Sequence, residues 1–371
     1  RSPLLSPYKM DNSGNILSSY SSYYYGDSQN MDFAVSNPLA IINNLDARNR
    51  QYDVNIKIGL SWKPMMGLSF NGTFGMFYNY NKEHLFIPGL TDHSTLPIND
   101  QYGTAENSVK EGVGEQTNFF ADANAKYEKT FNGVHKFSSM IGAQMLITNA
   151  RYEAGAGRNT PNDFYQTLSD VKDIGRYFYG YLEKWNWANL YAHAEYTYHN
   201  MVATSLNMSF DGASSSGTYG TRMFAYPSLG VTLLGKGWSS ISNSTVINRL
   251  NIRAEYGLSG NSQFSSNLGK YYYTSSPYMT NAGIIRANIS NTNLKPERTT
   301  LLNLSLDLGM WNNRLALTFD YYNNVTNDVI FAVPHSSAFG TLNYYDNCGK
   351  IKNHGVELAI QATLMNLKDF K

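Results

Sequence analysis

The feature that most constrains this chain is a strict alternation of side chains, which residues 313–327 show in its plainest form. Apolar residues occupy Leu315, Leu317, Phe319 and Tyr321, whereas polar or small residues occupy Arg314, Ala316, Thr318 and Asp320. Successive side chains of a β-strand point to opposite faces of the sheet, so this period of two predicts a strand with one apolar face. That face could pack on a second sheet in a soluble sandwich, or it could meet lipid outside a barrel.

The same alternation recurs along the chain of 371 residues. We expect about eleven strands, at residues 54–62, 68–80, 119–131, 135–147, 189–198, 202–212, 224–234, 250–261, 299–310, 313–327 and 355–364. Most of these segments exceed the roughly 5 to 6 residues usual in soluble sheets, and none shows sustained helical periodicity. The pattern predicts an all-β, antiparallel fold.

Short turns and long loops alternate between the expected strands. Two-residue turns are expected at Asn132-Gly133, His199-Asn200 and Asn312-Asn313, and a short break at Lys63-Pro64. Long, irregular connections are expected at residues 83–115, 153–186, 262–296 and 327–346. Outer-membrane barrels show this asymmetry, with short periplasmic turns and long extracellular loops, whereas loops beyond about 12 to 15 residues are uncommon in compact soluble domains.

Charged side chains avoid the apolar face of the expected strands. The alternation places nine of them on the opposite face: Lys57, Lys126, Glu195, Arg253, Glu255, Asp307, Arg314, Asp320 and Glu357. A Lys or Arg on the lipid face costs roughly 2 to 4 kcal/mol near the bilayer midplane, so this segregation favours a membrane barrel with a polar interior. Trp62, Tyr80, Trp311 and Tyr321 are expected in aromatic girdles at the membrane interfaces.

Composition excludes several classes of protein. Charged residues make up 15% of the chain and the formal net charge is +1, which argues against a nucleic-acid-binding surface. The single Cys348 excludes an intrachain disulfide and a multi-cysteine metal site. No run of apolar residues approaches the roughly 18 to 20 that a membrane-spanning helix needs. The N-terminus lacks an initiator Met and a signal-peptide pattern, so we expect a mature or internal piece of a longer chain.

Five short motifs between residues 210 and 330 carry a family resemblance. They are FDGASS, FAYPSLG, AEYGLSGN, LKPERT and DYYNNVTNDVI, in this order. Together they resemble the barrel of a TonB-dependent outer-membrane transporter of the SusC/RagA type. The resemblance covers residues 187–362 well, and the N-terminal part fits more loosely.

The resemblance implies active import across the bacterial outer membrane. Members of this family are barrels of about 22 strands, closed by an N-terminal plug that couples to TonB, and they typically pair with a SusD-like surface lipoprotein. On this basis residues 1–371 are expected to be about half of one barrel domain, with the plug domain and the remaining strands outside this segment. The expected substrates are glycans or oligopeptides, and no cofactor, metal site or enzymatic activity is expected.

Aromatic clusters in or next to the long connections are the candidate substrate-binding residues. They are Tyr24, Tyr25, Trp185, Trp187, Tyr272, Tyr273, Tyr344 and Tyr345. Such rings could stack on sugar faces or clasp a peptide, because they combine apolar area with a polar group. They could equally pack the loops against one another or against a lid protein.

Two other functions stay open at this point. One is a surface β protein that binds glycan or mediates adhesion without transport. The other is an outer-membrane enzyme, but none of the G-x-S-x-G, P-loop or zinc-protease motifs occurs in the sequence.

Overall fold

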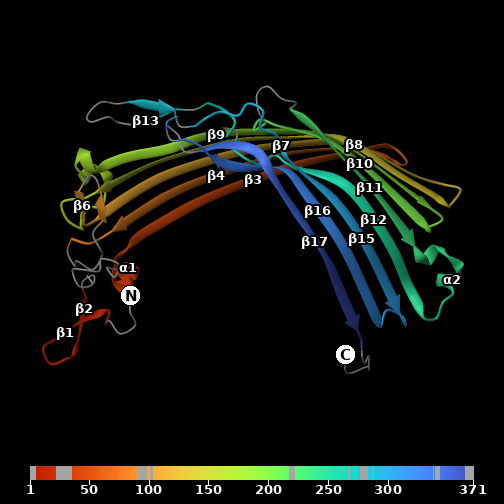
Figure 1. Ribbon diagram of the computed structural model, residues 1–371, viewed down its shortest axis with the longest axis horizontal. Coiled ribbons are helices and arrows are strands. Elements are labelled where there is room, and N and C mark those ends of the chain that lie inside the picture. The colour runs from red at the N-terminus through yellow and green to blue at the C-terminus, as the bar shows by residue number, and fades with distance from the viewer. Residues whose placement is uncertain are drawn as a thin grey trace. The chain divides into compact units, whose positions relative to one another are not determined.

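The computed structural model describes residues 6–21, 36–90, 98–100, 103–216, 222–265, 268–271, 273–275, 283–286, 288–336, 338 and 343–363. Within these residues, eleven long strands form one sheet in the order β17-β16-β15-β12-β11-β10-β9-β8-β7-β4-β3 (Figure 1). Their bounds are β3 (Asp46–Met65), β4 (Leu68–Ile87), β7 (Ser108–Phe131), β8 (His135–Arg158), β9 (Arg176–Tyr198), β10 (Val202–Ala213), β11 (Met223–Leu234), β12 (Ile247–Asn261), β15 (Glu297–Met310), β16 (Leu315–Pro334) and β17 (Asn343–Ala362).

Smaller elements fill the connections. The strands among them pair as the two-stranded sheets β1 (Tyr8–Met10) with β2 (Ile16–Tyr20), β5 (Ile98–Asp100) with β6 (Gly103–Ala105), and β13 (Tyr273–Ser275) with β14 (Ile284–Arg286). The helices are α1 (Pro38–Asn44) and α2 (Ser239–Ser242), and the 3-10 turns are η2 (Leu168–Asp170), η3 (Asp173–Gly175) and η4 (Gly235–Gly237). None of the helices in the described part of the chain has the length and hydropathy to cross a membrane.

The prediction of eleven strands is confirmed, because each expected segment corresponds to one long strand of the sheet. Several strands are longer than expected. The connections at 83–115, 153–186 and 327–346 shrink to residues 88–107, 159–175 and 335–342, whereas the connection at 262–296 matches. The predicted boundaries were wrong because alternation is visible only where the two faces meet different solvents, and backbone pairing continues where both faces meet water.

The tight turns follow the expected chemistry at three places. Positive φ angles occur at Asn132 (50°) and Gly133 (69°), at His199 and Asn200, and at Asn312 and Asn313, a conformation that Asn and Gly adopt most readily. The break expected at Lys63-Pro64 is wrong. β3 continues to Met65, and the turn falls at Met66-Gly67, where Gly67 has a φ of 84°. Pro64 is the next-to-last residue of β3, immediately before this turn.

The chain divides into two compact units, of which unit 1 comprises residues 1–55, 77–117 and 149–182. Its buried centre consists of Phe86, Val109 and Val171, with Leu168 packed against them. The Asn37 side chain caps α1 by accepting from the backbone N–H groups of Leu39 and Ala40. Unit 1 therefore holds the ends of β4, β7, β8 and β9 that adjoin the long connections.

Unit 2 comprises residues 56–76, 118–148 and 183–371, and its register separates two chemically different faces. One cross-strand row of neighbours contains Tyr198, Val202, Leu233, Ile252, Leu306, Phe319 and Leu358. The next row, on the other face, contains Thr197, Ala203, Thr232, Arg253, Ser305, Asp320 and Glu357. The segregation of charge predicted from the sequence is therefore present across seven strands.

The apolar face of unit 2 is open rather than covered by a second sheet. Leu206 is 55% exposed, and Leu358 and Ile360 are 61% and 63% exposed. Other exposed members of this face include Leu229, Ile252, Tyr256, Leu304 and Val356. An apolar surface of this extent is stable only against lipid, because soluble proteins rarely expose apolar patches beyond a few hundred Å². We therefore name this surface the lipid face and the opposite one the lumen face.

One glycine of unit 2 has a close packing role that gives a testable prediction. A Cβ on Gly260 would overlap the ring of Tyr226, whose side chain is buried. We expect Gly260→Val to destabilise the protein by about 1 to 3 kcal/mol, the usual cost of overpacking. The matched control is Gly72→Val on β4, where an added Cβ meets nothing within 4 Å. Urea denaturation of both variants measures the difference, and equal losses of stability would contradict the packing argument.

Candidate functional site

Two pairs of aromatic rings mark the limits of the lipid face on β3 and β4. Trp62 and Phe70 stack with ring centroids 5.5 Å apart, and Tyr52 and Tyr80 lie 6.3 Å apart. Tyr52 and Trp62 are ten positions apart on β3, or about 33 Å along a strand. A tilt of about 40° shortens this to roughly 25 Å, the usual height of the apolar band between aromatic girdles. Residues beyond Tyr52 and Tyr80 therefore lie outside the hydrocarbon region.

The lumen face of unit 2 carries chains of hydrogen-bonded polar groups. His193 Nδ1 lies 2.5 Å from the Asn207 side-chain oxygen, and Asn207 donates to the Ser228 hydroxyl at 3.0 Å. Arg253 and Glu255 form an ion pair of 3.7 Å. An open pocket of 450 Å³ is lined by these two residues together with Ser305, Asp320 and Glu357. Such a surface suits a water-filled interior.

A cluster of tyrosines lies in unit 1, and we name Tyr152, Tyr177, Tyr179 and Tyr181 the tyrosine patch. The rings of Tyr152 and Tyr181 stack with centroids 5.8 Å apart, and those of Tyr177 and Tyr179 stack at 6.0 Å. Tyr152 and Tyr179 are 6.3 Å apart and tilted. The alternation along β9 places Tyr177, Tyr179 and Tyr181 in the same phase as Trp185, Trp187 and Tyr191, which is the phase of the lumen face.

An ion pair lies against this patch. Lys110 Nζ is 3.3 Å from Glu83 Oε2, and the Tyr152 hydroxyl donates to the same oxygen at 3.0 Å. The ammonium group lies 6.0 Å from the Tyr152 ring centroid and 5.9 Å from that of Tyr179, which allows a cation–π attraction. Gly112 makes the arrangement possible, because a Cβ there would come within 2.8 Å of the Tyr152 hydroxyl.

The pKa values of these groups follow from the contacts. Burial acts to raise the pKa of Glu83, but hydrogen bonds from Tyr152 and Lys110 outweigh it and lower the pKa below its usual value. Hydrogen bonding to Tyr179 and Tyr152, and then to Glu83, raises the pKa of Lys110. Burial raises the pKa of Tyr152. Near neutral pH Tyr152 is therefore a neutral phenol beside a paired cation and anion.

The lowered pKa of Glu83 predicts an acid-sensitive contribution to stability. Because the folded-state pKa lies below the unfolded value, the contribution is present above about pH 4.3 and is lost as the pH falls through the folded pKa. We expect Glu83→Gln to remove this part of the pH dependence, which is about 1 kcal/mol or less for a partly exposed pair. Thermal unfolding between pH 7 and pH 3 measures it.

The matched control for this prediction is Glu153→Gln on β8. Glu153 is an exposed carboxylate that pairs with Arg151 across 3.0 Å. If Glu83→Gln and the wild-type protein lose stability in parallel on acidification, the ion pair contributes nothing.

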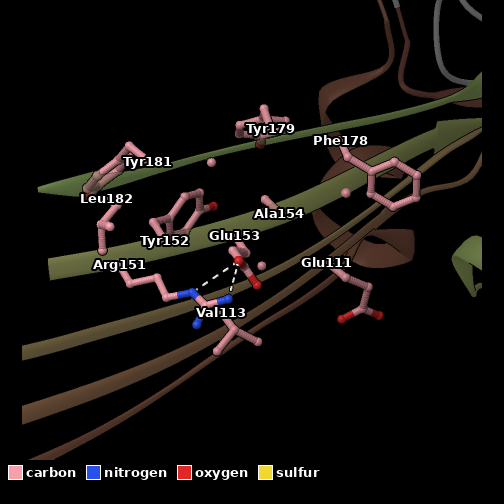
Figure 2. A pocket seen from close by; sticks show the side chains of 13 residues that line it. Glu111, Val113, Arg151, Tyr152, Glu153, Ala154, Phe178, Tyr179, Tyr181 and Leu182 are labelled. Atoms are coloured by element: carbon pink, nitrogen blue, oxygen red, sulfur yellow. Dashed lines mark hydrogen bonds and ion pairs between the residues drawn. The ribbon is translucent and has the colours of Figure 1, made fainter. Parts of the chain in front are cut away.

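The patch borders an open pocket of 830 Å³ formed by β7, β8 and β9. Figure 2 shows the rings of Tyr152, Tyr179 and Tyr181 along these strands, and the Arg151–Glu153 pair with its dashed contacts. The rings of the patch, together with Lys110 and Glu83, offer stacking surface and hydrogen bonds to an uncharged ligand. Within the described residues, no group of three or more His, Cys, Asp or Glu side chains could hold a metal ion.

The aromatic residues predicted as substrate contacts lie in separate places. Tyr24, Tyr25 and Tyr272 fall outside the described residues. Trp185 and Trp187 lie within β9 rather than in a long connection, and Trp185 Nε1 donates to the Ser262 carbonyl at 3.4 Å. Their expected placement was wrong because β9 begins nine residues before Trp185, at Arg176.

Tyr273, Tyr344 and Tyr345 are strand residues as well. Tyr273 is exposed in the β13–β14 hairpin, where it pairs with Arg286. Tyr344 and Tyr345 are the second and third residues of β17 and pair with Val333 and Ala332 of β16. A role of any of these residues in substrate binding stays a prediction.

Sequence reasoning missed the tyrosine patch and its ion pair. Lys110, Tyr177, Tyr179 and Tyr181 fall in segments that were expected to be irregular. A signal was present, because Tyr177, Tyr179 and Tyr181 alternate with Phe178, Gly180 and Leu182. This segment is aromatic on both sides of the alternation, so the two faces could not be told apart by hydropathy.

Three of the five motifs that carry the family resemblance meet at the ends of β12, β15 and β16. Glu297 Oε2 accepts from Asn261 at 3.1 Å, and its Oε1 accepts from the backbone N–H of Ile330 at 3.0 Å. Arg298 pairs with Asp328 at 3.3 Å. The motifs AEYGLSGN, LKPERT and DYYNNVTNDVI therefore contact one another, and these contacts connect the ends of three strands.

Comparison with known proteins agrees with the fold. The family described as TonB dependent receptor-like, beta-barrel matches residues 5–370. The chain is 26% identical over 341 residues to TonB-dependent receptor P39 of Formosa agariphila, covering 89% of this chain and 31% of that protein. It is 23% identical over 325 residues to TonB-dependent receptor SusC of Bacteroides thetaiotaomicron, covering 81% and 31%.

Solved structures show the same architecture. The structure of the RagAB peptide transporter superposes with a TM-score of 0.81 at 19% identity, covering 95% of this chain and 38% of that one. The chain thus spans about a third of the length of the relatives it matches.

The family consists of receptors and transporters rather than enzymes, and its place is the outer membrane. The open lipid face, the polar lumen face and the family match over nearly the whole sequence lead to one assignment. This chain belongs to the TonB-dependent receptor-like β-barrel family.

Proposed function

We propose that the full-length protein imports glycans or oligopeptides across the outer membrane by a TonB-dependent mechanism. The observation that carries the proposal is the match of residues 5–370 to this barrel family, together with an aromatic, net-neutral patch on the lumen phase of β8 and β9. A relative is named SusC, and the similar solved complex is titled a peptide transporter.

In this proposal residues 1–371 are one portion of a single barrel domain of about 22 strands. A plug domain and the remaining strands would complete the full-length protein, and TonB would displace the plug. A SusD-like surface lipoprotein would capture the ligand and pass it to the lumen. The tyrosine patch would hold it there by stacking and hydrogen bonds, without covalent chemistry or a cofactor.

An uptake experiment tests the proposal. Cells that produce the full-length protein, cells that lack it and cells that lack TonB receive a fluorescent oligosaccharide mixture or a fluorescent tryptic digest. We expect internalised label from one of the two mixtures, and only when both the protein and TonB are present. Label that binds the cell surface equally without TonB and never enters would instead support a glycan-binding or adhesion protein.

A further inference from the structure

A group of cations lies on the outer side of unit 1, immediately beyond the Tyr52–Tyr80 girdle. On β3, toward the start of the strand, Arg50 and Arg48 are the next two side chains on the same face as Tyr52. On β4, toward the end of the strand, Lys82 is the next side chain on the same face as Tyr80. The contact between the Tyr52 and Tyr80 rings shows that these two positions are neighbours across the antiparallel pair. Arg50 and Lys82 are therefore the next neighbouring pair along the two strands.

Two of these cations are available to a ligand. Arg48 is paired with Asp46, and an oxygen of the other carboxylate nearby, Glu111, lies 2.6 Å from His84 Nδ1. Arg50 and Lys82 are exposed, and within the described residues neither has an ion pair or hydrogen bond. The two carboxylates are thus occupied, and two positive charges are left without a partner.

These side chains line a pocket rather than a flat surface. Its volume is 380 Å³, and its walls are Arg48, Arg50, Lys82, His84 and Glu111, with Gln166 and Thr167 from the connection between β8 and β9. The Thr167 hydroxyl already donates to Asp170 at 2.8 Å, so the guanidinium and ammonium groups are the donors that could bind phosphate oxygens. The pocket is on the lipid-facing phase of its strands, so a ligand that travels through the lumen would not reach it.

The position of the pocket relative to the membrane indicates which class of ligand it binds. A girdle tyrosine sits at the level of the lipid headgroups, and the long connections adjoining unit 1 belong to the extracellular side of such barrels. Arg50 and Lys82, which follow directly after the Tyr52–Tyr80 pair, and Arg48, which follows Arg50, therefore face the headgroups of the outer leaflet. Basic pockets at this level attract anionic lipids. We propose that Arg48, Arg50 and Lys82 form a binding site for the phosphate of an outer-leaflet glycolipid.

The test uses the full-length protein in nanodiscs of phosphatidylcholine that contain a small fraction of diphosphorylated or dephosphorylated lipid A. Native mass spectrometry counts the lipid A molecules that stay bound after delipidation. We expect the wild-type protein to retain the diphosphorylated lipid at least tenfold better than the dephosphorylated one. The double variant Arg50→Gln/Lys82→Gln should lose this preference, because each cation near a membrane surface contributes severalfold to anionic lipid binding.

A matched control removes two cations from the lumen face, in the variant Lys57→Gln/Lys126→Gln, and should retain the lipid as the wild-type protein does. Equal retention by the wild-type protein and the Arg50/Lys82 variant would overturn the proposal, as would equal retention of the two lipids. Inorganic phosphate at millimolar concentration serves as a further probe. If it displaces the lipid completely, the site recognises free phosphate and the lipid assignment fails.

Discussion

Replacing Leu304 by Arg is expected to block assembly of the full-length protein in the outer membrane. Leu304 lies in the middle of β15 on the lipid face, between Ala254 and Tyr321 of the neighbouring strands, and its side chain is 42% exposed. The expectation that Tyr321 lies in a girdle is therefore wrong, because β16 extends well beyond it on both sides. A guanidinium at this depth must leave water for hydrocarbon, at a cost of roughly 2 to 4 kcal/mol. The fraction of folded protein, read from heat-modifiable mobility in gels of outer-membrane extracts, measures the effect.

Ser305→Arg is the matched control, because it introduces the same side chain one residue away on the opposite face. Ser305 lies between Arg253 and Asp320 in the polar row, so the new cation would meet water and a carboxylate. We expect near wild-type assembly of this variant. The reverse ranking of Leu304→Arg and Ser305→Arg would show that the two faces have been assigned the wrong way round.

The second large effect is expected from removing two rings of the tyrosine patch. Tyr179→Ala/Tyr181→Ala eliminates the stacking partners of Tyr177 and Tyr152. Each aromatic contact contributes about 0.5 to 1.5 kcal/mol, so the half-saturation concentration for uptake should rise roughly five- to a hundredfold. The ligand in this assay is whichever fluorescent mixture the uptake experiment shows to be imported.

Two comparisons separate a binding role from a structural one. Tyr179→Phe/Tyr181→Phe keeps the rings and should keep most of the affinity. Tyr256→Ala removes an exposed tyrosine from the lipid face and should leave the half-saturation concentration unchanged. If the double alanine variant assembles normally and transports with unaltered half-saturation, the patch is not part of the substrate path.

The sequence was most informative where each strand separates lipid from water. Leu302, Leu304, Leu306 and Leu308 alternate with polar residues, and the whole of that expected segment lies in β15. Prediction succeeded there because burial in hydrocarbon imposes a strong, regular cost on every second position.

The sequence was least informative beyond the apolar band, where the candidate site lies. Both faces of β8 and β9 meet water there, so Tyr152 and Tyr179 gave no alternation of hydropathy. The contact between Lys110 and Glu83 joins β7 to β4 across 27 positions of sequence, and only the strand pairing brings the two together. For the same reason the sequence did not indicate a site at Arg50 and Lys82. Their proposed role depends on their position next to the ring pair of Tyr52 and Tyr80, which only the structure shows.

The tyrosine patch lies on hydrogen-bonded strands and not on a loop. The effect of an insertion or deletion on the direction of the rings therefore depends on whether it falls in a loop or in a strand. Residues 159–175 connect β8 to β9, and a change of length there leaves the phase of Tyr177, Tyr179 and Tyr181 untouched. A single residue inserted inside β9 would instead turn every ring between the insertion and the strand end to the membrane side. The connecting loop can therefore change in length and sequence while the rings of the tyrosine patch keep their place on the sheet.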